Sequence, residues 1–209
     1  VMKKTKRSKK SRSWVIKQHR DQFYKKSKVL GYRARSAFKL IELNKKFKFI
    51  KNNCTLLDIG ASPGGWSQIS KEINNKGQIV AIDIKPMEKI EGVQFLQHDF
   101  MDPKIKNKIL EIFKGKIDVI ISDMAADTTG NKNLDCIRTN LLCAEVIEFA
   151  TKILKLKGTL IAKLFMGEDF IEVKKNAKKN FKKVEFFKPE SSRDKSKETY
   201  IHCNLLKAL

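Results

Sequence analysis

Acidic residues, paired cysteines and long apolar runs are scarce in this chain of 209 residues. Its 23 Asp and Glu stand against 45 Lys and Arg, which leaves a formal net charge of +22. Apolar runs last only a few residues, which excludes a membrane span, and no apolar signal segment follows the basic start, which argues against secretion. Cys54, Cys136, Cys143 and Cys203 form no C-x-x-C pair. We therefore expect reduced, packed thiols and no metal site in a cytoplasmic protein, or in one from an organelle of bacterial descent such as a mitochondrion or plastid.

The excess of positive charge is densest at the start of the chain. Residues 1–20 hold nine Lys and Arg and no acid, and the remainder is basic as well. A basic body with a basic arm is the electrostatic footprint of a polyanion binder, with nucleic acid as the first candidate. A lysine-rich proteome and a transit peptide are the alternative explanations. We predict a partly flexible RNA-binding arm over residues 1–30 and a single domain over residues 31–209.

Strand-like and helical segments alternate over the rest of the chain. Strands are expected at 54–59, 78–84, 92–97, 117–122 and 158–165, and helices at 31–49, 65–73, 104–113, 134–154 and from 168 to about 179. The middle strands are continuous apolar runs, as when helices cover both faces of a sheet. The last two strands, 183–188 and 199–206, have no helix between them, which favours an antiparallel pair. The fold class is therefore α/β: a Rossmann-like, doubly wound, mostly parallel seven-stranded sheet with an antiparallel C-terminal strand.

The loop after the first strand is rich in turn-forming residues. Gly60, Pro63, Gly64 and Gly65 fall within "DIGASPGGW", directly before Trp66. Glycines let a ligand approach the backbone where a Cβ would obstruct it. The spacing differs from the G-x-G-x-x-G of dinucleotide enzymes, and the proline removes an N–H that a pyrophosphate would bind, so a dehydrogenase is disfavoured. A nucleoside ligand without phosphates, such as S-adenosylmethionine, fits better, and a bare turn without ligand is the alternative.

Three carboxylates follow three neighbouring strands at one edge of the expected sheet. Asp83 ends the second strand, Asp99 follows the third and Asp123 follows the fourth. One acid at a strand end is often a helix cap, but three at neighbouring ends indicate a ligand cleft. Asp83 is spaced to accept hydrogen bonds from ribose hydroxyls, and Asp99 with Phe100 could hold an adenine. The sequence thus predicts a nucleoside-cofactor cleft.

Five segments, in matching order and spacing, resemble the FtsJ/RrmJ (RlmE) family of ribosomal RNA ribose 2′-O-methyltransferases. They are "DIGASPGGWSQ", "AIDIKPM", "FLQHDF", "ISDMA" and "SSRDKSKETYI", within a likeness that spans about residues 14–206. The resemblance implies methyl transfer from S-adenosylmethionine to a ribose 2′-hydroxyl, of a uridine in large-subunit ribosomal RNA within the large ribosomal subunit. A tRNA or mRNA-cap substrate and a non-catalytic RNA-binding assembly factor remain alternatives. No protein partner is implied, and a monomer is expected.

The resemblance also assigns roles to residues of this chain. The family's catalytic tetrad corresponds to Lys39, Asp123, Lys163 and Glu198, and its cofactor positions correspond to Gly64, Trp66, Asp83, Asp99 and Asp123. Lys163, which is unusual inside the apolar run "TLIAKLF", is expected to be the base or an electrostatic stabiliser, with Lys39 and Glu198 as positioning groups. One departure is the loop "MAAD" after Asp123, which lacks the family's proline. The expected RNA contacts are Lys3, Lys4, Lys6, Arg7, Lys9, Lys10, Arg12, Arg33, Arg35 and Arg193.

Overall fold

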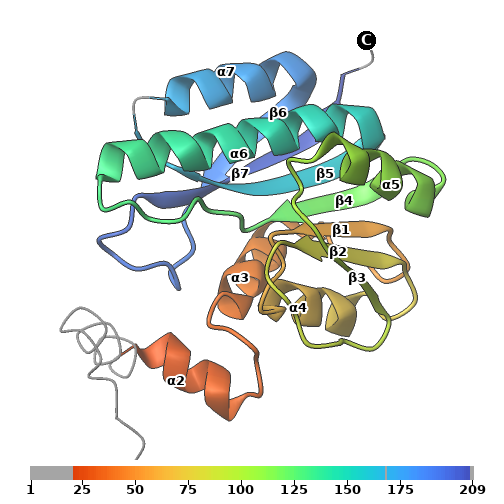
Figure 1. Ribbon diagram of the computed structural model, residues 1–209, viewed down its shortest axis with the longest axis horizontal. Coiled ribbons are helices and arrows are strands. Elements are labelled where there is room, and N and C mark those ends of the chain that lie inside the picture. Colours follow the sequence, from red (N-terminus) through yellow and green to blue (C-terminus); the bar gives the residue numbers. More distant parts are fainter. Residues whose placement is uncertain (1–20, 168, 208–209) are drawn as a thin grey trace, which may run out of the picture.

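Seven strands form one sheet in a computed structural model that describes residues 21–167 and 169–207 (Figure 1). Their order across the sheet is β3-β2-β1-β4-β5-β7-β6. The strands are β1 (Leu56–Ile59), β2 (Ile79–Asp83), β3 (Val93–Gln97), β4 (Ile117–Ser122), β5 (Leu154–Phe165), β6 (Phe181–Phe187) and β7 (Glu198–Leu206). The first five pair in parallel, and β7 lies antiparallel between β5 and β6. The predicted fold class is confirmed.

Helices cover both faces of this sheet, as the continuous apolar strands predicted. On one face α5 (Pro103–Phe113), α6 (Lys132–Ile153) and α7 (Phe170–Asn180) pack against the larger core cluster. On the other face α3 (Ala37–Phe47) and α4 (Gly65–Ile73) enclose a second cluster (Figure 1). The central strands β1, β2 and β4 are therefore desolvated from both sides, and polar groups concentrate where these strands end.

The N-terminal part of the described chain differs from the prediction. A helix that was not predicted, α2 (Gln22–Val29), begins at Asp21, whose carboxylate accepts the backbone N–H groups of Phe23 and Tyr24 at 3.1 and 3.2 Å. It ends at Val29 and is followed by Leu30 as C-cap and by Gly31, which has a φ of +71°. The helix expected from residue 31 was therefore predicted too early, and α3 begins only at Ala37. The arm boundary at residue 30 stays a prediction.

Smaller differences concern strand ends and segments that the structure does not describe. The strand expected from residue 158 begins at Leu154, directly after α6, because Leu154 pairs with Ile117 ahead of an irregularity in the ladder.

All four cysteines are free and buried, as expected. The seven basic residues expected to bind RNA between positions 3 and 12 lie outside the described residues, as does the expected helix start at 168. No helix in the described part is long and apolar enough to cross a membrane.

Candidate active site

The four residues of the expected tetrad meet at the carboxyl end of the sheet. The Nζ of Lys39 lies 2.6 Å from Oε1 of Glu198, and the Nζ of Lys163 lies 3.0 Å from Oδ1 of Asp123. The two pairs also meet, because Lys163 Nζ is 3.9 Å from Oε2 of Glu198. Four segments supply them: α3, the end of β4, β5 and the start of β7. Two ammonium groups and two carboxylates thus form one compact cluster in which the charges balance.

Secondary-structure geometry explains why these side chains converge. Ala37, Leu40 and Leu43 of α3 are fully buried, and Lys39 lies beside that apolar arc with a side chain 12% exposed. In the antiparallel ladder Lys163 lies opposite Tyr200, so both side chains are on the same face. Glu198 precedes Tyr200 by two residues and shares its face. Lys163 is therefore buried within an apolar strand because its side chain faces the carboxylates of Asp123 and Glu198.

Two further residues complete the cluster, and the sequence reasoning missed both. The Tyr200 hydroxyl donates to Oδ1 of Asp123 at 2.6 Å, and the Ser192 hydroxyl donates to Oε1 of Glu198 at 2.8 Å. The period-2 alternation of β7 could have indicated Tyr200. Ser192 lies in a loop, where no periodicity applies.

Charge and burial together set the protonation of this cluster. Burial raises the pKa of Asp123, but the positive charges of Lys163 and Lys39 and the hydrogen bond from Tyr200 outweigh it, so the pKa lies below its ordinary value. Burial, and then the negative charge of Asp123, raises the pKa of the Tyr200 hydroxyl. Asp123 is thus an anion and Tyr200 a neutral donor at physiological pH. The Lys163 Nζ also donates to the backbone oxygen of Asp123 at 2.6 Å.

A cleft of about 620 Å³ opens beside the tetrad and shares Asp123 with it. Its lining includes four more of the expected cofactor residues: Gly60, Asp83, Asp99 and Phe100. Gly60 has a φ of +77°, and a Cβ there would lie 2.6 Å from the Cγ of Met124. The chain therefore needs glycine where β1 enters the loop at this cleft. Sequence reasoning missed Arg138, Leu141 and Leu142 of α6, which line the opposite wall.

The polar groups of the cleft fit a nucleoside. Asp83 accepts the N–H of Ser62 through one carboxylate oxygen and the N–H of Lys85 through the other, at 2.9 and 2.8 Å, and each oxygen keeps a second lone pair for a ligand hydroxyl. One oxygen of Asp99 accepts the N–H of Met101 at 2.8 Å, and its other oxygen has no hydrogen-bond partner among residues 21–167 and 169–207. Carboxylates held by backbone groups are orientated acceptors for ribose and adenine donors. The residues present therefore suit S-adenosylmethionine.

Other expected cofactor residues do not line the cleft. The Trp66 side chain is 2% exposed, packs on Tyr200 and donates from Nε1 to the Ser36 oxygen at 2.8 Å. Its backbone N–H lies in the first turn of α4, where N–H groups lack helical acceptors. A Cβ on Gly64 would lie 3.0 Å from the Arg33 side chain, and one on Gly65 3.2 Å from Ser36. Around these glycines, and around Pro63 beside them, the structure shows the 33–36 turn packed against the loop.

The arginines expected to bind RNA are held by the protein itself. Arg33 donates to the backbone oxygens of Glu88 and Lys89, and Arg35 pairs with Asp21 and donates to the Ser191 oxygen. Arg193 has a side chain 60% exposed, with Nε 3.9 Å from the same Asp21 carboxylate. Arg193 is therefore the most accessible of the three, and Arg35 links α2 to the 189–196 loop that precedes Glu198.

The loop after Asp123, which lacks the family's proline, is held by α6. Thr139 accepts the N–H of Ala126 at 3.3 Å, and Arg138 donates to the Asp127 oxygen at 3.2 Å. Contacts from α6 thus hold the loop that forms part of the cleft lining.

An α/β sheet with a nucleoside cleft at the carboxyl ends of its strands, adjoining a Lys-Asp-Lys-Glu cluster, defines a nucleoside-cofactor methyltransferase. The FtsJ-like methyltransferase model matches residues 32–205. The chain belongs to this family and is a methyltransferase.

Curated relatives and solved structures agree with this assignment. The chain is 46% identical over 197 residues to ribosomal RNA large subunit methyltransferase E of Pelagibacter ubique, covering 94% of this chain and 97% of that protein. It is 43% identical to the protein of the same name from Rickettsia akari, covering 94% of this chain and 89% of that one. A Plasmodium falciparum protein assigned as a ribosomal RNA methyltransferase superposes with a TM-score of 0.76 at 34% identity, over 84% of this chain and 98% of that chain.

Proposed function

We propose that this enzyme transfers a methyl group from S-adenosylmethionine to a ribose 2′-hydroxyl of large-subunit ribosomal RNA. The observation that carries the proposal is the buried Lys39–Glu198–Lys163–Asp123 cluster, which shares Asp123 with the nucleoside cleft. The relatives that cover nearly the whole chain are named as ribosomal RNA large subunit methyltransferases, which supports that substrate class. When bound, S-adenosylmethionine would supply an electrophilic methyl group on a positively charged sulfur, and the electron pair of the broken carbon–sulfur bond would stay on the sulfur of a neutral thioether.

The cluster is arranged to activate a hydroxyl. Once the Lys163 ammonium has released a proton, its amine keeps two N–H groups for its two acceptors on Asp123 and leaves its lone pair for the proton of the substrate hydroxyl. The proton passes to Lys163 as the hydroxyl oxygen forms its bond to the methyl group. Glu198, held by Ser192, is in turn paired with Lys39 and places that cation at the same site. Lys39 then stabilises the developing negative charge on the oxygen.

The substrate and the base are tested together by offering radiolabelled methyl from S-adenosylmethionine to large ribosomal subunits, protein-free ribosomal RNA and tRNA. The expected result is label in large-subunit RNA, recovered as 2′-O-methyl ribose and lost with Lys163→Ala. Label confined to tRNA would contradict ribosomal RNA as the substrate and would still support methyl transfer to a ribose hydroxyl. Cofactor binding without label on any RNA would contradict the enzymatic proposal and favour an assembly factor.

RNA contacts are proposed for the basic residues of the arm, together with Arg193. Phosphate contacts fix the position of an RNA without reading its sequence. Truncation of residues 1–20 should weaken RNA binding and reduce its salt dependence, since each lost phosphate contact lowers the slope of log affinity against log salt. An unchanged slope would remove the arm from the binding surface.

A further inference from the structure

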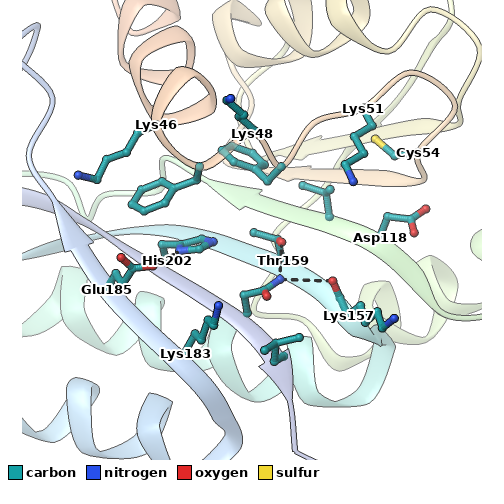
Figure 2. A pocket seen from close by; sticks show the side chains of 15 residues that line it. Lys46, Lys48, Lys51, Cys54, Asp118, Lys157, Thr159, Lys183, Glu185 and His202 are labelled. Atoms are coloured by element: carbon teal, nitrogen blue, oxygen red, sulfur yellow. Dashed lines mark hydrogen bonds and ion pairs between the residues drawn. The ribbon is translucent and has the colours of Figure 1, made fainter.

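A second hollow, of about 710 Å³, is shown in Figure 2. It lies toward the amino ends of the parallel strands β4 and β5, whereas the tetrad lies toward their carboxyl ends. Its wall includes Asp118 near the start of β4, whereas the catalytic Asp123 follows the end of that strand. Five residue steps of extended chain separate these two positions, which places their Cα atoms roughly 16 Å apart. The hollow is therefore distinct from the cofactor cleft. Its lining includes five lysines from three separate segments: Lys46, Lys48, Lys51, Lys157 and Lys183.

These five lysines lack carboxylate partners. The two acids that line the hollow are engaged elsewhere: Asp118 pairs with Lys155 at 2.7 Å, and Glu185 lies 3.3 Å from Nδ1 of His202. Within the described ranges, no salt bridge involves any of the five. Figure 2 shows labelled lysines from all three segments around the same space. The Lys46 ammonium lies over the Phe187 ring, 4.9 Å from its centroid, whereas the other four have no such contact in the described ranges. Like charges without counter-charges repel one another, and a bound anion would relieve that repulsion.

The floor of the hollow is built from fixed groups. The Phe47 ring stacks on His202 with centroids 4.0 Å apart and planes at 21°. Burial lowers the pKa of His202 although Glu185 acts the other way, so the imidazole is neutral at physiological pH. The Asn204 amide donates to the Thr159 hydroxyl at 2.9 Å and to the Lys157 oxygen at 3.3 Å, as the dashed lines in Figure 2 mark. The lysines therefore surround a preformed base of neutral side chains, and their five positive charges exceed the two negative charges of Asp118 and Glu185 in the same lining.

We propose that this basic hollow binds backbone phosphates of the RNA substrate, as a second contact remote from the catalytic cleft. This inference rests on the proposed function, since it extends the RNA footprint across the protein. Lysines act as point charges that position phosphates without a planar geometry, and a wide open hollow lined from three segments suits several phosphates rather than one. A folded ribosomal RNA is large enough to reach both edges of the sheet at once.

The test neutralises three of the lysines, one from each segment, by the substitutions Lys51→Gln, Lys157→Gln and Lys183→Gln in one protein. The matched control carries Lys108→Gln, Lys175→Gln and Lys179→Gln, which remove the same charge from exposed positions on α5 and α7. RNA affinity is measured at several salt concentrations, on large ribosomal subunits and on protein-free ribosomal RNA. Thermal unfolding and calorimetric cofactor binding verify that both proteins are folded.

We expect the hollow variant to lose about 2 from the magnitude of the slope of log affinity against log salt, since each phosphate contact contributes about 0.7–0.9. Its KM for RNA rises several-fold while kcat and cofactor affinity stay unchanged. The control keeps the parent slope within about 0.5. Equal slopes for the two variants on both RNA samples would overturn the inference. Methyl transfer by the parent protein is scored separately, so a failure here differs from a failure of the proposed function.

A footprint supplies the second readout. Amine-reactive labelling, read by mass spectrometry, should show Lys51, Lys157 and Lys183 protected by RNA, with Lys108 and Lys179 unprotected. Protection of the hollow by inorganic tripolyphosphate but not by RNA would overturn the proposal in favour of a small polyphosphate ligand.

Discussion

Asp58 lies in the middle of β1 with no exposed surface, directly below the cofactor loop. One carboxylate oxygen accepts the Ser67 hydroxyl at 2.6 Å, and the other has no hydrogen-bond partner in the part of the chain that the structure describes. The pKa of Asp58 is raised from 3.8 to about 7, chiefly by burial and also by the charges of Asp123 and Asp83, against the lowering effect of the Ser67 hydrogen bond. Substitution by Asn, which resembles the protonated acid, should therefore change how stability depends on pH.

The expected change in the free energy of unfolding follows from the pKa shift of Asp58. A rise of about three pKa units corresponds to roughly 4 kcal/mol, at 1.36 kcal/mol a unit. Below pH 3.8 the carboxyl is protonated in both the folded and the unfolded chain, and it adds no pH dependence. Between pH 3.8 and 7 the unfolded chain releases the proton and the folded chain keeps it, so this group lowers the free energy of unfolding as pH rises. Above pH 7 the carboxyl is ionised in both states, and its full destabilisation of the folded state is present.

The assay is urea unfolding of the parent and of Asp58→Asn at intervals from pH 4.5 to pH 8. The free energy of unfolding of the variant should rise relative to the parent across this range by about 3 kcal/mol, because part of the full effect is already present at pH 4.5. The new amide changes the free energy of unfolding by an amount that does not depend on pH. The test is therefore the slope against pH of the difference in free energy of unfolding between variant and parent. A difference that stays flat, or that falls with pH, would refute the reasoning.

Asp118→Asn is the matched control with the opposite sign. Burial raises the pKa of Asp118, but Lys155 and Thr55 outweigh it, so the pKa lies below its ordinary value. A depressed carboxyl stabilises the folded state above its unfolded pKa and loses that contribution as pH falls. The deficit of Asp118→Asn relative to the parent should therefore stay almost constant from pH 4.5 to pH 8 and shrink only as pH falls below about 3.8, in contrast to the Asp58 variant.

Three further substitutions test the site. Lys163→Ala should lower kcat by about 10²–10⁴-fold with cofactor affinity by calorimetry unchanged, and near-parent turnover would remove its role as base. Ser192→Ala, which leaves Glu198 without its 2.8 Å donor, should lower kcat by roughly 5–10-fold at unchanged cofactor affinity. An equal loss from Ser191→Ala, whose hydroxyl has no hydrogen-bond partner in the part of the chain that the structure describes, would make the effect non-specific. Gly60→Ala should weaken cofactor binding and destabilise the fold by about 1–3 kcal/mol, because its Cβ would meet Met124; unaltered binding and melting temperature would contradict the crowding.

The sequence alone predicted much of the architecture and the edge where chemistry occurs. Continuous apolar strands between amphipathic segments determine a doubly wound sheet, because only helices on both faces can bury such strands. Parallel strands end at the same side of a sheet, so the sequence predicts that Asp83, Asp99 and Asp123 share a cleft, and the structure places all three in one lining. Lys163 stood out because a lysine inside an apolar strand is costly unless it has partners. Local pattern and general chemistry were sufficient for these conclusions.

Other features were decided only by the tertiary structure, because they depend on contacts between segments far apart in sequence. No period relates Ser192 to Glu198 or Arg35 to Asp21, and the burial of Trp66 depends on which side of α4 meets α3. The basic hollow is of the same kind: its lysines come from three segments and resemble ordinary surface charges when read singly. The sequence shows that a residue is a lysine, whereas the fold determines whether a carboxylate lies close enough to pair with it.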